Sequence, residues 1–256
     1  MRTLGFALAS LLVTSAVGQA APKQFVQNGG FETVNPVATN ASGNFEFGAS
    51  YAPNSGPNVV PGWVSPTKSA YNLIFNPINA FTPAGNAKGN YDYTGKEYLN
   101  GGASGKASQN GGKFAAIDGD PTYSGPIQQQ INGLIVGQAY NLTFDWAAAQ
   151  VASRKGATTD YISAMLGSSV YNTPTFNLPS AGFSGWMTAS HAFIATSTSE
   201  LLSFLDKGTP AGLPPIALLD GVRLIGPSNT AVPEPAAIAI LGLGLAGLGA
   251  ARLRRR

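Results

Sequence analysis

Hydrophobic and polar residues alternate along much of the middle of the chain. The clearest alternation runs from Tyr140 to Trp146, where Tyr, Leu, Phe and Trp are separated by Asn, Thr and Asp. A period of two places the apolar side chains on one face, so this segment predicts a half-buried strand. Segments bounded by Gly and Pro predict further strands over residues 71–75, 114–117, 127–131, 160–166, 186–195, 200–205 and 217–225.

Short strands joined by many turns predict an all-β fold. No long stretch between residues 23 and 226 has the helical period, and 32 Gly, 18 Pro and 11% charged residues are unfavourable for a helical bundle. Residues 22–228 therefore predict one antiparallel β-sandwich or barrel. Residues 35–112, rich in Asn, Gly, Pro and Ser, predict long loops around a few weak strands.

The first 20 residues have the organisation of a secretory signal peptide. Arg2 precedes an apolar run over residues 4–17, and Gly18 and Ala20 supply the small residues that a signal peptidase reads. We expect cleavage after Ala20; the alternative is an N-terminal core helix. The chain has no Cys, which is compatible with export and excludes disulfides, Cys-based zinc sites and a thiol nucleophile.

The C-terminal end predicts a short membrane anchor. Residues 236–251 form an apolar stretch about 24 Å long as a helix, shorter than the roughly 30 Å hydrocarbon layer, so insertion in the inner membrane would be marginal. Pro233 and Pro235 hold the preceding backbone extended. The basic residues after the stretch should stay cytoplasmic; they are Arg252, Arg254, Arg255 and Arg256.

This arrangement closely resembles the PEP-CTERM sorting tail of Gram-negative bacteria. Pro233, Glu234 and Pro235, a Gly/Ala/Leu helix and the arginine cluster follow in the same order within residues 229–256. The resemblance implies that an exosortase in the cytoplasmic membrane recognises residues 232–235 and cuts there. It also implies that the body then reaches the cell surface or an exopolysaccharide matrix. The alternative is an ordinary anchor that stays attached.

The basic net charge belongs to the two ends. Residues 21–230 carry 10 positive and 11 negative charges, so the body lacks the basic surface that binding to nucleic acid requires. Gly242, Gly244 and Gly247 match a dinucleotide-binding fingerprint, but they lie inside the apolar stretch and follow no strand, which excludes that function.

The body resembles the galactose-binding-like jelly rolls of carbohydrate-binding modules. The matching segments, in order, are residues 26–32, 61–63, 127–131, 137–144 and 217–224. The resemblance implies a jelly-roll β-sandwich that associates with extracellular polysaccharide. It also implies one structural Ca²⁺ held by Glu32 and Asp220 with backbone carbonyls. In the alternative, these two carboxylates are exposed or bond turn amides.

Candidate sugar-binding rings are Tyr123 and Trp186, with Tyr71 and Trp63 as further possibilities, because sugars bind on aromatic faces flanked by polar groups. Trp63 and Trp146 are predicted to lie in the core.

The sequence contains few candidate catalytic residues. His191 is the single His and shares a strand face with apolar residues, which favours a structural role. A glycan hydrolase would need two carboxylates, and Asp118, Asp120 and Asp145 are conceivable members, although Asp118 and Asp120 also suit an ordinary turn. We therefore predict a non-enzymatic surface or matrix protein that binds carbohydrate. A purely structural or adhesive protein, or a hydrolase, remains the alternative.

Overall fold

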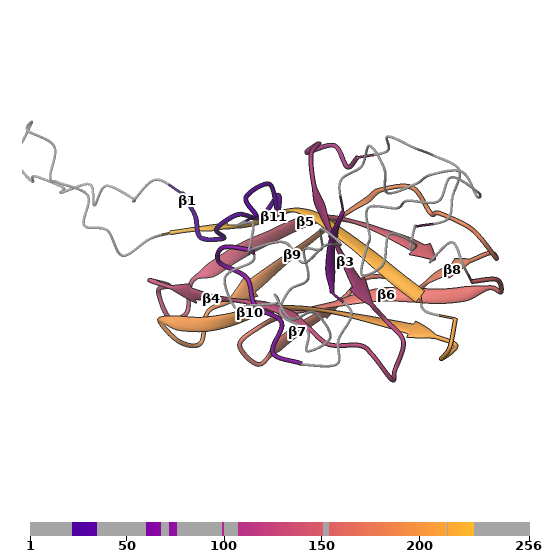
Figure 1. The fold of residues 1–256 in the computed structure, drawn as a ribbon. Coiled ribbons are helices and arrows are strands. Elements are labelled where there is room, and N and C mark those ends of the chain that lie inside the picture. The colour runs from indigo at the N-terminus through magenta and orange to yellow at the C-terminus, as the bar shows by residue number, and fades with distance from the viewer. Residues whose placement is uncertain are drawn as a thin grey trace, which may run out of the picture. The chain divides into compact units, whose positions relative to one another are not determined.

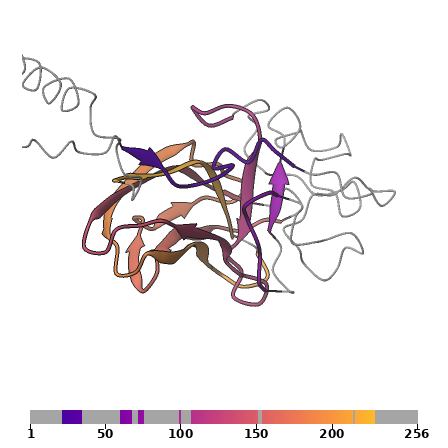
Figure 2. The ribbon, with the colours of Figure 1, turned by 90° about the vertical axis from the view of Figure 1, so that its left-hand side faces the viewer.

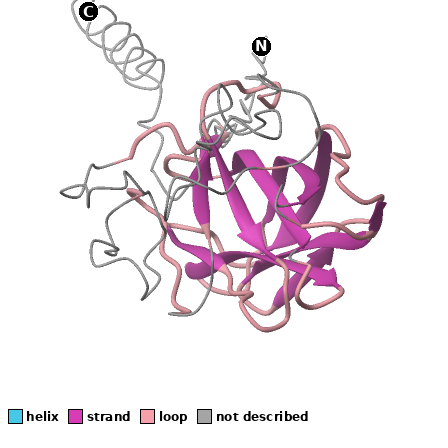
Figure 3. Cartoon of the chain, turned by 45° about the vertical axis from the view of Figure 1, so that its right-hand side comes forward, coloured by secondary structure: helices cyan, strands magenta, loops and turns pink. Residues whose placement is uncertain are grey.

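The computed structural model describes residues 22–34, 60–67, 72–75, 99, 107–150, 154–213 and 215–227. All regular elements in these residues are strands, and no described helix is long and apolar enough to cross a membrane (Figure 3). The strands are β1 (Lys23–Gln24), β2 (Leu73–Phe75), β3 (Phe114–Asp118), β4 (Ile127–Asn132), β5 (Ala139–Gln150), β6 (Thr158–Leu166), β7 (Ser169–Asn172), β8 (Phe176–Leu178), β9 (Met187–Ile194), β10 (Ser199–Thr209) and β11 (Pro215–Gly226).

Two antiparallel sheets form a sandwich. The first has the order β2-β3-β11-β5-β9, with β1 also paired to β11, and the second has the order β4-β10-β6-β7, with β8 also paired to β6. Figures 1 and 2 show the two layers, with β5 and β11 in one and β6 and β10 in the other. The all-β sandwich predicted from the sequence is therefore confirmed, and each predicted strand overlaps an observed one.

The main core lies between the two sheets, and β5 shows why. Tyr140, Leu142 and Phe144 are buried on the inner face, as the alternation predicts. Phe204 of the second sheet meets Phe144 edge-on, with ring centroids 5.2 Å apart. Burial of such side chains contributes about 1.5–3 kcal/mol each to folding.

A second, smaller core covers part of the outer face of the first sheet. Its members come from β2, β3, β5 and β11, together with Leu99 outside the strands; they are Leu73, Phe75, Leu99, Phe114, Ala116, Ala147, Ala149, Ile216 and Leu218. Trp186 packs on this cluster and meets Phe114 edge-on at 5.3 Å between ring centroids. Both faces of the last part of β5 are consequently buried, so its residues no longer alternate.

The first and last strands lie side by side. Lys23 pairs with Gly226 and Gln24 with Ile225. The Tyr140 hydroxyl fastens this end of the sandwich, because it accepts the Ile135 N–H at 2.7 Å and donates to the Pro227 carbonyl at 2.9 Å.

The predicted signal peptide (1–20, with Ala20), the sorting tail (229–256) and Tyr71 lie outside the described residues.

Candidate functional site

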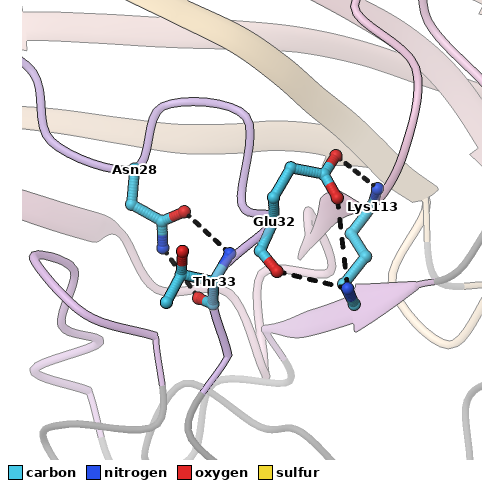
Figure 4. Close-up of polar contacts among 4 residues, drawn as sticks. All are labelled: Asn28, Glu32, Thr33 and Lys113. Atoms are coloured by element: carbon cyan, nitrogen blue, oxygen red, sulfur yellow. Dashed lines mark hydrogen bonds and ion pairs between the residues drawn. The ribbon is translucent and has the colours of Figure 1, made fainter.

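Glu32 follows a tight turn near the N-terminus of the sandwich. Asn28 closes the turn, because its side-chain amide donates to the Thr33 carbonyl at 2.8 Å and its Oδ1 accepts the Thr33 N–H at 3.1 Å (Figure 4). Glu32 Oε1 accepts the Lys113 N–H at 2.8 Å, and Lys113 Nζ lies 3.2 Å from the Glu32 carbonyl and 4.0 Å from Oε2. Gly112 makes this approach possible, since a Cβ there would lie 1.6 Å from Oε1.

Asp220 is fully buried on β11, beside an irregularity in the pairing of β11 with β5. The Ser108 hydroxyl donates to its Oδ2, and the Gly221 N–H donates to its Oδ1 at 2.6 Å. Burial raises the pKa of Asp220 to about 7, the two hydrogen bonds lower it, and the charges of Glu32 and Asp145 raise it. A cation nearby would therefore favour the ionised form of this carboxyl.

The two predicted calcium ligands both lie near Gly30. A Cβ at that position would lie 3.8 Å from Asp220 Oδ1 and 3.9 Å from Glu32 Cγ. The donor chemistry fits Ca²⁺, which prefers carboxylate and carbonyl oxygens. Within the described ranges, however, no three His, Cys, Asp or Glu side chains are arranged to hold a metal. A cation here would be held by two side chains and the main chain.

Asp145 lines a polar groove on the outer face of the first sheet. Asn110 Nδ2 donates to Asp145 Oδ2 at 2.8 Å, and Thr188 Oγ1 donates to Oδ1 at 2.7 Å. The groove has a volume of about 210 Å³ and is lined by Gln109, Asn110, Thr143, Phe144, Asp145, Thr188, Gly221 and Arg223. These contacts explain why Asp145 is buried, although the alternation along β5 places its side chain on the polar face of that strand.

Asp118 and Asp145, two of the carboxylates considered for glycan hydrolysis, lie too far apart to act as a pair. Asp118 pairs with Ile216 of β11, whereas Asp145 pairs with Asp220, four residues further along that strand. Four residues span about 13 Å, which exceeds the roughly 5–9.5 Å of glycosidase carboxylates. Asp118 accepts the Asp120 N–H at 2.7 Å, and Asp120 accepts the N–H of Gly212 at 2.6 Å, so both serve as turn caps.

Three aspartates are buried together at the end of the sandwich where β11 begins. Burial raises the pKa of Asp118 to about 7 and that of Asp160 to about 8, and it raises the pKa of Asp206 well above its usual range. Asp160 and Asp118 raise the pKa of Asp206 further by their charge. Asp206 Oδ2 accepts the Ala217 N–H at 2.7 Å, but Oδ1 of Asp206 and Oδ1 of Asp160 have no hydrogen-bond partner among the residues that the structure describes.

The aromatic residues predicted to bind sugar are dispersed. Tyr123 is 40% exposed in the turn after β3, and Trp186 is half-buried on the second core. Trp63 is buried in the main core, as predicted. His191 stacks on Tyr171, with ring centroids 4.6 Å apart and planes 14° apart.

Sequence reasoning missed an aromatic slot at the edge between the sheets. The slot has a volume of about 350 Å³ and is lined by Trp146, Tyr171, Pro174, Thr175, Phe176, Met187, Thr188, Ala189 and Ser190. Tyr171 and Phe176 come from the edge strands of the second sheet, and Met187 comes from the edge strand of the first. The only signal in the sequence is an aromatic residue in each of two short strands.

Comparison with known families decides the nature of the C-terminal end, where residues 231–256 match the PEP-CTERM protein-sorting motif. The tail is a PEP-CTERM motif. This confirms the resemblance predicted from Pro233, Glu234 and Pro235, and the PEP-CTERM motif marks the chain as an exported protein sorted to the cell surface. None of the curated proteins matches the chain.

Several solved structures are similar to the body that precedes the PEP-CTERM motif. TmCBM61 in complex with β-1,4-galactotriose is 12% identical with a TM-score of 0.36, over 79% of this chain and 97% of that one. The C-terminal family 22 carbohydrate-binding module of Clostridium thermocellum Xyn10B is 11% identical with a TM-score of 0.35, over 79% and 100%. The C-terminal domain of the sugar-binding protein EclA is 18% identical with a TM-score of 0.30, over 38% and 64%, so the chain spans less than two thirds of it. All three of these TM-scores lie below 0.5.

Proposed function

We propose that this protein is an exosortase substrate whose β-sandwich associates with extracellular polysaccharide without catalysing a reaction. The PEP-CTERM motif at residues 231–256 carries the proposal, because it directs a protein to the cell exterior. Signal peptidase removes residues 1–20, the 236–251 segment inserts transiently in the inner membrane, and exosortase cuts near residues 232–235. The body then resides at the cell surface or in the exopolysaccharide matrix.

Features of the sandwich support association with sugar polymers. The body is close to neutral, with 10 positive and 11 negative charges between residues 21 and 230, which suits contact with polysaccharide better than with nucleic acid. The groove beside Asp145 offers amide, hydroxyl, carboxylate and guanidinium groups on a rigid sheet. Pairing of β1 with β11 is compatible with a jelly-roll connection.

The sorting step is tested in the native host by mass spectrometry of protein from each cell fraction. We expect extracellular protein that lacks residues 1–20 and everything after the Pro-Glu-Pro motif. Glu234→Ala is expected to accumulate in the membrane fraction with Arg252–Arg256 still attached. Intact chain in the cytosol, bearing both ends, would contradict the proposed route.

Association with polysaccharide is tested by sedimenting the processed protein with the host's own exopolysaccharide and by screening it on a glycan array. We expect binding to at least one polymer. Failure on every glycan would instead favour a purely structural or adhesive role. Release of reducing sugar during the incubation would favour the hydrolase.

Glu32 and Asp220 are proposed to hold one structural Ca²⁺ at the corner that joins the N-terminal turn to β11. A ligand at 100 times its Kd stabilises a fold by about 2.7 kcal/mol, which corresponds to a rise in Tm of about 5–10 °C for a domain of this size. We therefore expect millimolar Ca²⁺ to raise the Tm and EDTA to reverse the rise, as measured by differential scanning calorimetry.

Two controls separate a specific site from general ionic effects. Mg²⁺ at the same concentration should stabilise much less, since it demands a smaller octahedral site. Glu32→Gln, at an exposed side chain, should keep the fold and lose the response to Ca²⁺. A Tm unchanged by both Ca²⁺ and EDTA would remove the metal from the proposal.

A further inference from the structure

The aromatic slot between the sheets is built from side chains with restricted motion. Stacking against His191, with the planes 14° apart, fixes the plane of the Tyr171 ring. Trp146 forms part of the wall and is only 3% exposed, whereas Tyr171 and Phe176 are half-buried. A volume of about 350 Å³ lies within the roughly 300–1,000 Å³ of small-ligand sites, which are lined by aromatic residues with a few polar groups.

One wall of the slot is the free edge of β9. Ala195 N–H donates to the Gln138 carbonyl, and antiparallel pairs alternate between bonded and non-bonded positions, so the main-chain N–H and C=O of Thr188 and Ser190 point away from β5. Within the described part of the chain, no strand pairs with that side of β9. The slot therefore presents donors and acceptors next to aromatic rings.

The lining of the slot contains no Asp, Glu, Lys or Arg. A charged ligand would lose hydration there without gaining a partner, whereas an uncharged one would not. Aromatic faces beside peptide and hydroxyl groups match a sugar ring, which has apolar C–H faces and a rim of hydroxyls.

We propose that this slot binds one or two neutral hexose units of the polysaccharide, with Tyr171 and Phe176 against the ring and the edge of β9 bonding the hydroxyls. This inference rests on the proposed association with polysaccharide, and it names the site and the substrate class. The polar groove beside Asp145 is then not the principal sugar site.

The experiment measures binding of the processed protein to the host exopolysaccharide and to neutral gluco-, galacto- and manno-oligosaccharides, with polygalacturonate as the charged comparison. We expect a neutral glycan to bind more tightly than polygalacturonate and to change the tryptophan fluorescence. Tyr171→Ala and Phe176→Ala should each weaken binding at least fivefold. Tyr161→Ala, at a half-buried tyrosine of β6 that does not line the slot, is the matched control and should bind as the wild type does.

Thr175→Trp provides a second variant should the alanine variants fold poorly, because Thr175 is exposed and a larger side chain there would fill the slot. Loss of binding in this variant, with an unchanged Tm, supports the site. Binding by the wild type that none of these substitutions weakens would overturn the site and leave the association with polysaccharide standing. Absence of binding to any glycan would overturn both.

Discussion

The Tm of this protein is expected to fall by at least about 10 °C between pH 5 and pH 9, measured in EDTA. Asp118 and Asp160, with pKa values of about 7 and about 8, are buried beside Asp206. Because these pKa values are higher in the folded than in the unfolded chain, the folded state holds more protons between about pH 4 and about pH 8. The stability that these groups contribute is therefore complete below about pH 4 and is lost as the pH rises from there through 7–8.

The size of the fall in Tm follows from how far the pKa values of the buried aspartates are raised. Raising one carboxyl pKa from 3.8 to about 7 corresponds to about 4 kcal/mol once that group is ionised in the folded state. A change of 1 kcal/mol moves the Tm of a domain of this size by about 2–4 °C.

Two variants test whether the buried aspartates cause this dependence. Asp206→Asn removes one ionisable group from the cluster and should reduce the dependence of the Tm on pH, with a higher Tm than the wild type at pH 9. Part of the dependence should remain, because burial still raises the pKa values of Asp118, Asp160 and Asp220. Lys207→Gln, on the exposed side of the same strand, is the control and should leave the slope unchanged. A wild-type Tm that stays level or rises from pH 5 to pH 9 would contradict the prediction.

Replacing Trp63 by Ala is expected to destabilise the fold by about 3–5 kcal/mol, because a large buried ring leaves a cavity that the surroundings fill only in part. The indole lies 5.3 Å from the Phe31 ring and 6.0 Å from the Phe204 ring, and its N–H donates to the Asn28 carbonyl at 3.0 Å. It thus joins the N-terminal turn to the second sheet. Urea unfolding measures the change in free energy.

Trp186→Ala is the matched comparison, since Trp186 is half-buried and packs against the smaller core. The Trp186→Ala variant should lose less than half as much free energy of unfolding as Trp63→Ala. Trp63→Phe, which keeps an aromatic ring but loses the N–H donor, should fall between the two. Equal costs for the two alanine variants would show that Trp63 does not carry the main core.

Local patterns predicted the strands and the sorting tail because both are encoded in consecutive residues. The alternation around Leu142 gave the inner face of β5 directly. The same rule fails from Ala147 to Gln150, where the second core buries the outer face as well. A strand that is buried on both faces does not show the alternation of hydrophobic and polar residues.

The sites depend on contacts between distant segments, which periodicity does not show. Asp206 lies two residues after Phe204 and four after Leu202, so the alternation along β10 could have predicted that its side chain points into the sandwich. Its proximity to Asp118 depends on how the two sheets stack. The slot forms only because β7, β8 and β9 are edge strands. The sequence of a single strand does not predict its place in the sheet. The calcium site expected at Glu32 and Asp220 stays a prediction, and the contact of Lys113 with Glu32 was not foreseen.

Pairing of Lys23 with Gly226 means that both ends of the folded body depart from one corner. The cluster of Asp118, Asp160 and Asp206 lies near the start of β11, about 30 Å along the strand from Gly226. The end of the domain that responds to pH is therefore opposite the corner where Lys23 pairs with Gly226.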